Sequence, residues 1–334
     1  MGGSTLNFAR GRGMRRTGTC VVLACALVAL PAVAQVRPFP TGPITLVVPL
    51  APGDAADIAA RALGEELSRL LKTPVVSINR PGAGGAVGTQ NVVQAKKDGH
   101  TILFAQNSAL TLRAVLDPQS VPYDALRDLL PLGTASRTPS LLVVRGDAPY
   151  KTFAELIEYA KSRPGQVRIG HPGVGSVGDF CVQSINALTG ADLVGIPFVG
   201  AAPAIVALRG EHIEGVVLSL GALSSQLRSG AFRGLVTSSR YPEFGDIPTM
   251  RELGYQEDLF GIWFSFLAPA GIPESARDAL VVAIEQAVNA PALAARLASL
   301  GILLKYATPE QTTTEIRTES KRVGDIARKT GLVK

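Results

Sequence analysis

Three short β-branched runs, each followed by a turn and then a helical pattern, constrain most strongly what this chain can fold into. The runs are residues 44–48 (ITLVV), 75–78 (VVSI) and 101–105 (TILFA). Residues 57–71 space their apolar side chains as a half-buried helix does, and residues 85–97 form the next predicted helix. Strands that are apolar on both faces and alternate with helices indicate a mostly parallel sheet covered by helices on both sides.

A second series of strands and helices follows and predicts another α/β unit. Thr152 and Glu155 have the spacing of a capping box, which predicts a helix that begins at Phe153. The predicted strands are residues 141–144, 167–169, 193–196, 213–218, 234–237 and 263–267, and the predicted helices are residues 153–162, 179–188, 202–209, 273–289, 291–299 and 309–328. With 334 residues the chain is long enough to form two lobes.

The N-terminal 34 residues have the order of a secretory signal peptide. They hold four arginines and no acidic residue, and an apolar run of ten residues at 21–30 precedes the small-residue pattern at 31–34 (PAVA). We expect cleavage after Ala34, export to the periplasm and no membrane insertion of the mature chain. An uncleaved anchor is the alternative, but this apolar run is short against the roughly 20 residues that span a bilayer. Met14, directly before two arginines, is an alternative start.

Charge and cysteine usage exclude several classes of function. The formal net charge is +6, yet without the four arginines of the signal peptide only 29 basic residues stand against 27 acidic ones. No basic stripe remains, so we expect no nucleic-acid partner. Cys20 and Cys25 would leave with the signal peptide, and Cys181 alone cannot form an internal disulfide. The three histidines have no metal-site spacing, so neither a metal nor a cofactor is expected.

A glycine-rich segment at residues 173–178 (GVGSVG) fits the dinucleotide fingerprint, with Asp192 at the expected distance beyond it. The fingerprint normally opens the first strand–helix unit of a domain, whereas this segment lies in the middle of an exported chain. Glycines let main-chain N–H groups approach any anion at a helix N-terminus, so a carboxylate is the preferred partner. Ser176 lacks the glycine two residues earlier that a nucleophile elbow needs, and His171 either shapes this loop or contacts a ligand.

Other candidate ligand contacts lie where predicted strands end. Gln106, Asn107 and Ser108 follow the third strand and are polar, as ligand-orienting residues at the carboxyl end of a strand are. Asp57 is expected to cap the first helix in preference to contacting a ligand. Arg80 either meets an anion or ties its own loop to neighbouring main chain.

The motifs of the mature chain together resemble one family. In chain order they are residues 49–53 (PLAPG), 79–85 (NRPGAGG), 98–103 (DGHTIL), 121–124 (VPYD), 164–165 (PG), 170–178, 196–200 (IPFVG), 247–249 (IPT), 263–264 (WF) and 267–273 (LAPAGIP). They cover nearly all of residues 37–330, and the second and last blocks are distinctive. The chain is similar to the periplasmic substrate-binding receptors of tripartite tricarboxylate transporters, often called Bug-type receptors.

This resemblance implies a two-lobed, type II-like periplasmic binding protein whose ligand cleft lies between two helix-flanked, mostly parallel sheets. The first lobe would comprise residues 35–138 and 256–334, and the second residues 139–255. The implied partners are a small-molecule solute and membrane transporter subunits, and a monomer is expected. Besides the three polar residues after the third strand, the implied ligand contacts are Leu50, Ala51, Pro52, Gly53, Asp54, Ala56, Asp57, Gly173, Val174, Gly175, Ser176, Val177, Gly178, Asp179, Phe198, Gly200 and Ala201.

The chain departs from the family pattern at positions near the implied cleft. Asp54 stands where a second glycine is usual, Asp179 lies where a histidine is common, and Val199 replaces a lysine. Two added carboxylates facing the cleft would repel a dicarboxylate or tricarboxylate, by about 1 kcal/mol per pair at 4 Å in water and about 4 at an effective dielectric of 20. We therefore hypothesise a solute with an amino or amide group beside any carboxylate, such as an amino acid or a pyridine carboxylate or amide, although an organic acid remains open. An exported hydrolase or dehydrogenase and a sensory binding protein are the alternatives.

Overall fold

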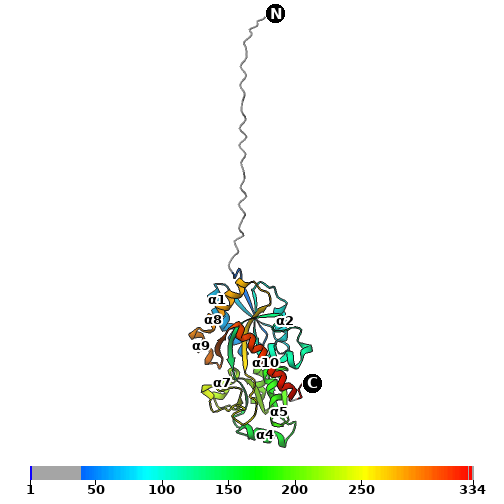
Figure 1. Cartoon of the computed structure of the whole chain (residues 1–334). Helices are drawn as coiled ribbons and strands as arrows, with labels where there is room; N and C mark the ends of the chain where they lie inside the picture. Colours follow the sequence, from blue (N-terminus) through cyan, green and yellow to red (C-terminus); the bar gives the residue numbers. More distant parts are fainter. Residues whose placement is uncertain (2–38, 330, 333–334) are drawn as a thin grey trace. The chain divides into compact units, whose positions relative to one another are not determined.

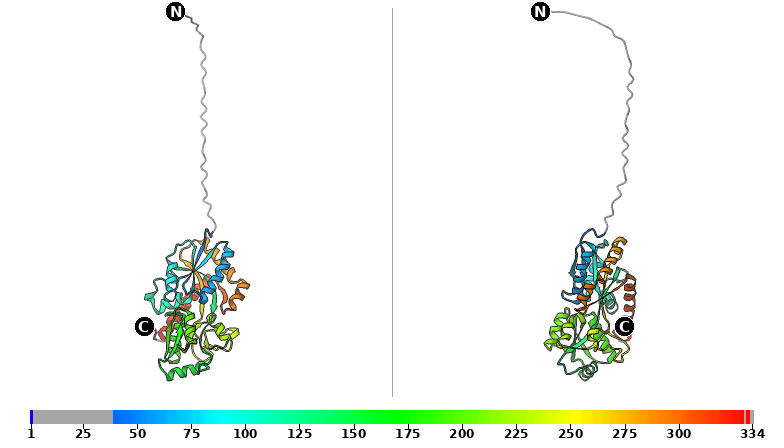
Figure 2. Two further views of the ribbon diagram at one scale, coloured as in Figure 1. Left: turned by 180° about the vertical axis from the view of Figure 1, so that it is seen from behind. Right: turned by 90° about the vertical axis from the view of Figure 1, so that its left-hand side faces the viewer.

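The computed structural model describes Met1, residues 39–329 and residues 331–332. The predicted signal peptide, apart from Met1, and its cleavage point lie outside the described residues. Within residues 39–332 the described strands form two sheets, one of six strands and one of five. Figure 1 shows these sheets at opposite ends of this part of the chain, each with its own helices, and Figure 2 shows the same separation from two other sides.

The six-stranded sheet forms the first lobe, with the strand order β11-β4-β10-β3-β1-β2. Its strands are β1 (Ile44–Val48), β2 (Val75–Asn79), β3 (Thr101–Gln106), β4 (Leu129–Thr138), β10 (Ile262–Pro269) and β11 (Leu303–Ala307). β1 pairs in parallel with both β2 and β3, whereas β10 runs antiparallel to β3 and β4. Three neighbouring parallel strands therefore end at one edge of the sheet.

Helices cover both faces of this first sheet. They are α1 (Ala55–Leu71), α2 (Ala86–Val93), α3 (Arg113–Leu116), α8 (Glu274–Val288), α9 (Pro291–Ala298) and α10 (Pro309–Lys329). Leu63 of α1 and Ile284 of α8 are fully buried in the cluster on one face, and Val92 of α2 and Ile316 of α10 belong to the cluster on the other. Among the described residues no single helix is long and apolar enough to cross a membrane, although α8 and α9 pass that test as a bent pair.

The five-stranded sheet forms the second lobe, with the strand order β7-β6-β8-β5-β9. Its strands are β5 (Ser140–Arg145), β6 (Val167–His171), β7 (Leu193–Pro197), β8 (Gly215–Ser219) and β9 (Phe232–Thr237), and its helices are α4 (Phe153–Ser162), α5 (Val177–Thr189), α6 (Ala201–Arg209) and α7 (Leu220–Arg228). β6 pairs in parallel with β7 and β8, and β5 runs antiparallel to β8 and β9. The predicted cap is present, because the Thr152 side chain accepts a hydrogen bond from the Glu155 N–H.

The structure confirms the predicted two-lobed α/β architecture and corrects it in detail. Both sheets are mixed, because antiparallel strands complete the parallel set in each. The sequence prediction missed β4, β11 and α7, and α2 ends at Val93 rather than at 97. β4 is the longest strand described, but it carries Pro131, Gly133 and three hydroxyl side chains in place of a β-branched run.

The chain passes between the sheets twice. It leaves the first sheet at the end of β4 and enters the second at β5, with Pro139 between them, and it returns ahead of β10. α10 lies beside this junction, where the guanidinium of Arg322 stacks over the Phe260 ring at 4.3 Å from its centroid. The residue boundaries predicted for the two lobes stay a prediction.

Candidate ligand-binding site

A cavity of about 430 Å³ lies between the two sheets. Its first-lobe wall comes from the loops after β1, β2 and β3, and its second-lobe wall comes from the loops after β6, β7 and β8. These are the carboxyl ends of the three adjacent parallel strands in each sheet. Parallel strands place the turns that follow them at one edge, which is where open α/β sheets bind ligands.

The structure brings most of the sequence-predicted site residues to this cavity. Those that line it are Leu50, Ala51, Asp54, Gln106, Ser108, Gly173, Val174, Ser176, Gly178, Phe198, Gly200 and Ala201. Those that lie behind or beside its wall are Pro52, Gly53, Ala56, Asp57, Asn107, Gly175, Val177 and Asp179. Contact of either set with a ligand stays a prediction.

Five helices of the described chain begin at the cavity wall. Their N-cap residues are Asp54 for α1, Gly85 for α2, Ser176 for α5, Gly200 for α6 and Ser219 for α7, and all five line the cavity. The first-turn N–H groups and the peptide dipoles make such an end electropositive, about half an elementary charge per helix. α2, α6 and α7 have no side-chain cap. Main-chain carbonyls already accept the Ala86 N–H of α2 and the Leu220 N–H of α7, so the first-turn donors of these helices that are not bonded in this way can serve a ligand. The wall is suited to an anion.

Asp57 holds the loop after β1 in place. Its carboxylate accepts the Gly53 N–H at 3.0 Å and an Asn79 amide hydrogen at 2.9 Å, and it pairs with Arg61 at 2.9 Å. Burial alone would raise the pKa of Asp57, but these bonds to Arg61, Gly53 and Asn79 outweigh it and hold that pKa below its usual value. The prediction that Asp57 caps α1 is wrong, because Asp54 is the N-cap and Asp57 lies in the first turn.

Asp54 is the acidic side chain at the cavity. Its carboxylate accepts the Ala56 N–H at 3.2 Å, and among the described residues no Lys or Arg forms an ion pair with it. Burial raises the pKa of Asp54, although the N–H groups of Ala56 and Ala55 lower it, and the charge of Asp57 raises it further. A carboxylate without a cation beside it favours a ligand that brings a positive or hydrogen-bond-donating group.

Arg113 is the cationic side chain at the cavity, and sequence reasoning missed it. The side chain is about 5% exposed, and its Nη1 donates to the Val174 carbonyl of the second lobe at 3.0 Å. Its Nη2 donates to Asp117 at 3.1 Å and to the hydroxyl of Ser120. Its position shortly after the predicted strand at residues 101–105 was the available signal.

The second-lobe glycine loop is held by Asp179, which does not face the cavity. Its carboxylate accepts the Gly175 N–H at 2.7 Å and the Gln183 amide at 2.9 Å. The expectation of two added carboxylates facing the cleft is therefore wrong, because Asp54 lines the cavity and Asp179 does not. The difference arises because Asp179 follows the N-cap Ser176 by three residues and bonds back to its own loop.

Ser176 and His171 do not form a nucleophile–base pair in this structure. The Ser176 hydroxyl accepts the Asp179 N–H at 3.1 Å as the cap of α5. His171 is buried, and its Nδ1 donates to the Gly173 carbonyl at 3.0 Å, because a carbonyl oxygen can only accept. Burial lowers the pKa of His171, against the opposing effect of Asp179. Among the described residues no group of three or more His, Cys, Asp or Glu side chains is placed to hold a metal ion.

The NRPGAGG block after β2 contributes three glycines to the cavity wall. Residues 81–85 of this block lie in the wall, whereas Arg80 is exposed and outside it. Gly82, Gly84 and Gly85 have positive φ values of 137°, 59° and 98°, which a side chain would strain. The glycines therefore serve the close approach of the backbone, and the signal in the sequence was the block itself rather than its arginine.

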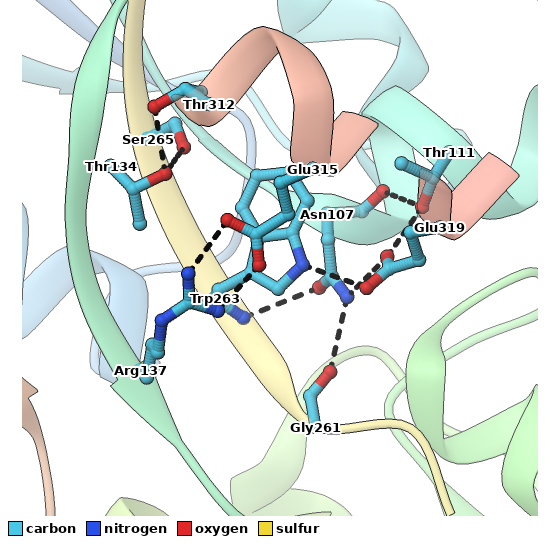
Figure 3. A network of polar contacts seen from close by, with 10 residues as sticks. All are labelled: Asn107, Thr111, Thr134, Arg137, Gly261, Trp263, Ser265, Thr312, Glu315 and Glu319. Carbon is cyan, nitrogen blue, oxygen red and sulfur yellow. Dashed lines mark hydrogen bonds and ion pairs between the residues drawn. The ribbon is translucent and has the colours of Figure 1, made fainter. Parts of the chain in front are cut away.

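A buried polar network behind the cavity supports the segment after β3 (Figure 3). Glu319 of α10 accepts the Asn107 amide at 2.9 Å, the Thr111 hydroxyl at 2.7 Å and the Trp263 indole N–H at 2.8 Å. Asn107 also donates to the Gly261 carbonyl at 3.0 Å. Asn107 is thus turned away from the cavity, and it fixes the chain between Gln106 and Ser108, which do line it.

Comparison with known proteins agrees with this geometry. The family described as "Tripartite tricarboxylate transporter family receptor" matches residues 59–332. Protein BugT of Bordetella pertussis is 34% identical over 314 residues, which cover 93% of this chain and 95% of BugT.

Two solved structures from Rhodopseudomonas palustris have the same fold. Rpa4515 with adipate is 26% identical with a TM-score of 0.82, and the match covers 88% of this chain and 98% of that one. MatC with bound malate is 29% identical with a TM-score of 0.81, and the match covers 86% and 99%. The resemblance found in the sequence is confirmed: this chain belongs to the receptor family of the tripartite tricarboxylate transporters, the periplasmic solute-binding proteins that include the Bug proteins.

Proposed function

We propose that this chain is a non-enzymatic, monomeric receptor of the periplasm. It closes its two lobes around a small solute that carries a carboxylate together with an amino or amide group. It then delivers the solute unchanged to the membrane subunits of a tripartite tricarboxylate-type transporter. The observation that carries this proposal is the convergence of five helix N-termini on one cavity that holds Asp54.

The carboxylate of the solute is expected at the uncapped helix ends. Gly85, Gly200 and Ser219 begin helices without a side-chain cap, and they come from both lobes. An anion at such an end gains about 0.3–1 kcal/mol at an exposed site and up to about 2 where the site is partly buried. Because both lobes contribute, the solute stabilises the closed arrangement more than the open one.

The second polar group of the solute is expected at Asp54. No Lys or Arg in the described part of the chain forms an ion pair with this carboxylate, so a second carboxylate of the solute would be repelled there and an ammonium or amide would be attracted. The related structures Rpa4515 and MatC hold adipate and malate, which are both dicarboxylates. Those relatives support the carboxylate part of the proposal, and the departure at Asp54 supports the amino or amide part.

Calorimetric titration with matched pairs tests the proposal. Glutamate against glutarate and aspartate against malate differ at the group that would face Asp54. We expect each amino acid to bind about tenfold or more tightly than its partner, which corresponds to about 1.4 kcal/mol. Native mass spectrometry of the protein as purified would identify a solute retained from the host.

Two outcomes would contradict the proposal at different levels. Tight binding of glutarate, malate or citrate with no response to the amino or amide compounds would overturn the solute class but keep the receptor. Multiple turnovers of any compound by the pure protein would overturn the receptor itself, because a receptor releases its solute unchanged.

A further inference from the structure

We infer that Arg113 is a latch that fastens the glycine loop of the second lobe onto the first lobe at one side of the cavity. Its role is to stabilise the closed arrangement of the lobes. It acts by positioning the Val174 main chain at the cavity wall. The inference rests on the proposed closing of the lobes, and it concerns a residue that the family motifs of this chain do not include.

The contacts of Arg113 join the two lobes directly. The residue belongs to α3 of the first lobe, and its Nη1 reaches the carbonyl of Val174 in the loop after β6 of the second lobe at 3.0 Å. On its own side the guanidinium is held by Asp117 at 3.1 Å and by Ser120. One planar group therefore anchors in the first lobe and donates across the cleft, which suits the fixed fork of an arginine.

Two glycines make room for this side chain. A Cβ on Gly175 would stand 2.4 Å from Nη1 of Arg113, and a Cβ on Gly84 would stand 2.9 Å from its Cδ. Both glycines have positive φ values, 74° and 59°. The Cβ position of Gly84 also lies 3.3 Å from the Val174 carbonyl oxygen, so the loop after β2 packs against the same point of the second lobe.

The latch lies on one side of the cavity and a second contact between the lobes lies elsewhere on its wall. There Gly200 of the second lobe approaches Ala51 of the first, with 3.7 Å between the Cβ atom of Ala51 and the Cβ position of Gly200. That contact is a van der Waals contact between apolar groups. Opening the cleft on the latch side breaks the bond from a buried guanidinium to Val174, whereas Ala51 and Gly200 are van der Waals neighbours. The lobes are also joined away from the latch, where Tyr241 donates to the Ala298 carbonyl at 3.0 Å and Arg228 donates to the Ser299 carbonyl at 3.2 Å.

The test measures the distance between the lobes in the absence of any solute. Spin labels at Lys96→Cys and Glu158→Cys sit on exposed positions of the first and second lobes, and the buried Cys181 stays unlabelled. Pulsed electron paramagnetic resonance then gives the populations of short and long distances. The variants are Arg113→Met, Arg113→Lys and Gly175→Ala. The matched control is Gly190→Ala, whose φ of 69° gives the same backbone strain with no atom within 4 Å of the new Cβ.

We expect the parent protein and Gly190→Ala to share a short-distance population. Gly175→Ala and Arg113→Met should shift the ratio of short to long distances by roughly tenfold or more, as loss of a charge-assisted hydrogen bond does, and Arg113→Lys should lie between. The inference is overturned if Gly175→Ala matches Gly190→Ala, or if the parent lacks the short distance. A role in stability alone would lower the melting temperature without moving the distances of the folded protein.

The same labelled protein separates this inference from the proposed function. Added aspartate or malate should raise the population of the short distance in the parent protein. If neither compound binds or changes the distances, the proposed solute class is wrong. The latch inference is still tested by the distance populations measured without solute. If a carboxylate binds and shifts Gly175→Ala to the short distance as readily as it shifts Gly190→Ala, the latch inference is wrong while the receptor function is supported.

Discussion

The indole N–H of Trp263 donates to the carboxylate of Glu319 at 2.8 Å and so joins β10 to α10 behind the cavity (Figure 3). The same carboxylate accepts hydrogen bonds from Asn107 and Thr111, which flank the cavity-lining Ser108. A carboxylate from the last helix therefore orders a wall of the cavity that is more than two hundred residues away in sequence.

Replacing Glu319 by alanine should destabilise the protein markedly. The change leaves buried donors of Trp263 and Asn107 without an acceptor, so we expect the free energy of unfolding to fall by about 2–4 kcal/mol in urea titrations. Asp325→Ala on the same helix is the control, because its ion pair with Arg328 is exposed and worth less than about 0.5 kcal/mol. Equal effects of the two substitutions would contradict this assignment.

The same carboxyl group should give a characteristic pH dependence. Burial raises the pKa of Glu319 above its ordinary value of 4.5, although bonds from Trp263, Thr111 and Asn107 oppose this. The folded state then holds the proton more tightly than the unfolded state, so the stability from this group is complete below pH 4.5 and falls as pH rises through the raised pKa. The unfolding free energy of the parent minus that of Glu319→Gln should shrink as the pH rises above 4.5 through the raised pKa of Glu319. A constant difference would show that Glu319 is not the group responsible.

Asp54→Asn should change the preference of the site and leave the fold intact. Asparagine still caps α1, so helix stability should be nearly unchanged. Loss of the charge should strengthen glutarate binding and weaken glutamate binding, each by about tenfold in calorimetric titration. Asp246→Asn, at an exposed position away from the cavity, should alter neither affinity. An Asp54 variant that binds both compounds like the parent would remove the basis of the proposed solute class.

The proposed role of Asp54 also sets the sign of a pH effect on binding. Burial raises the pKa of this carboxyl, so it gains its proton at a higher pH than an exposed aspartate. Protonation removes the negative charge that an ammonium would meet, so glutamate affinity should fall as pH is lowered through that pKa. The Asp54→Asn variant should show a flat profile in the same titrations, and parallel profiles would contradict the pairing.

Two helical glycines should respond in opposite directions to alanine. A Cβ on Gly88 in α2 would stand 2.6 Å from the Arg80 carbonyl oxygen and 2.8 Å from Pro49, so Gly88→Ala should lower the unfolding free energy by about 1–3 kcal/mol. A Cβ on Gly324 in α10 meets only ordinary contacts from 3.4 Å, so Gly324→Ala should raise stability by about 0.5–1 kcal/mol through helix propensity. Thermal unfolding of both variants checks the sign.

The spacing of apolar and capping residues correctly predicted those strands and helices whose own sequence carries a clear pattern. The run at residues 44–48 is apolar apart from Thr45 and forms β1, and the capping box at Thr152 begins α4 where expected. The sequence of β4 shows no such pattern, because Pro131 and Gly133 interrupt it. In the structure β4 pairs with β10, and the register of this pairing shifts near both residues. Strand pairing of this kind depends on neighbours distant in sequence.

The candidate site divides in the same way. Glycine-rich turns after apolar strands identified the loops at residues 50–54, 173–178 and 198–201, because the carboxyl ends of parallel strands share an edge. Which side chains of a loop face the cavity did not follow from the sequence. Asp54 and Asp179 look alike as acidic residues near a helix start, yet Asp54 lines the cavity and Asp179 bonds to the Gly175 N–H.

The sequence by itself determined the family, the two-lobed α/β plan and the glycine loops that favour an anion, because these depend on local composition and on the order of motifs. The tertiary structure alone placed Arg113 across the cleft against Val174 and Glu319 behind the wall. Those contacts join residues far apart in the chain, and whether a buried charge finds its partner depends on packing that no local pattern encodes.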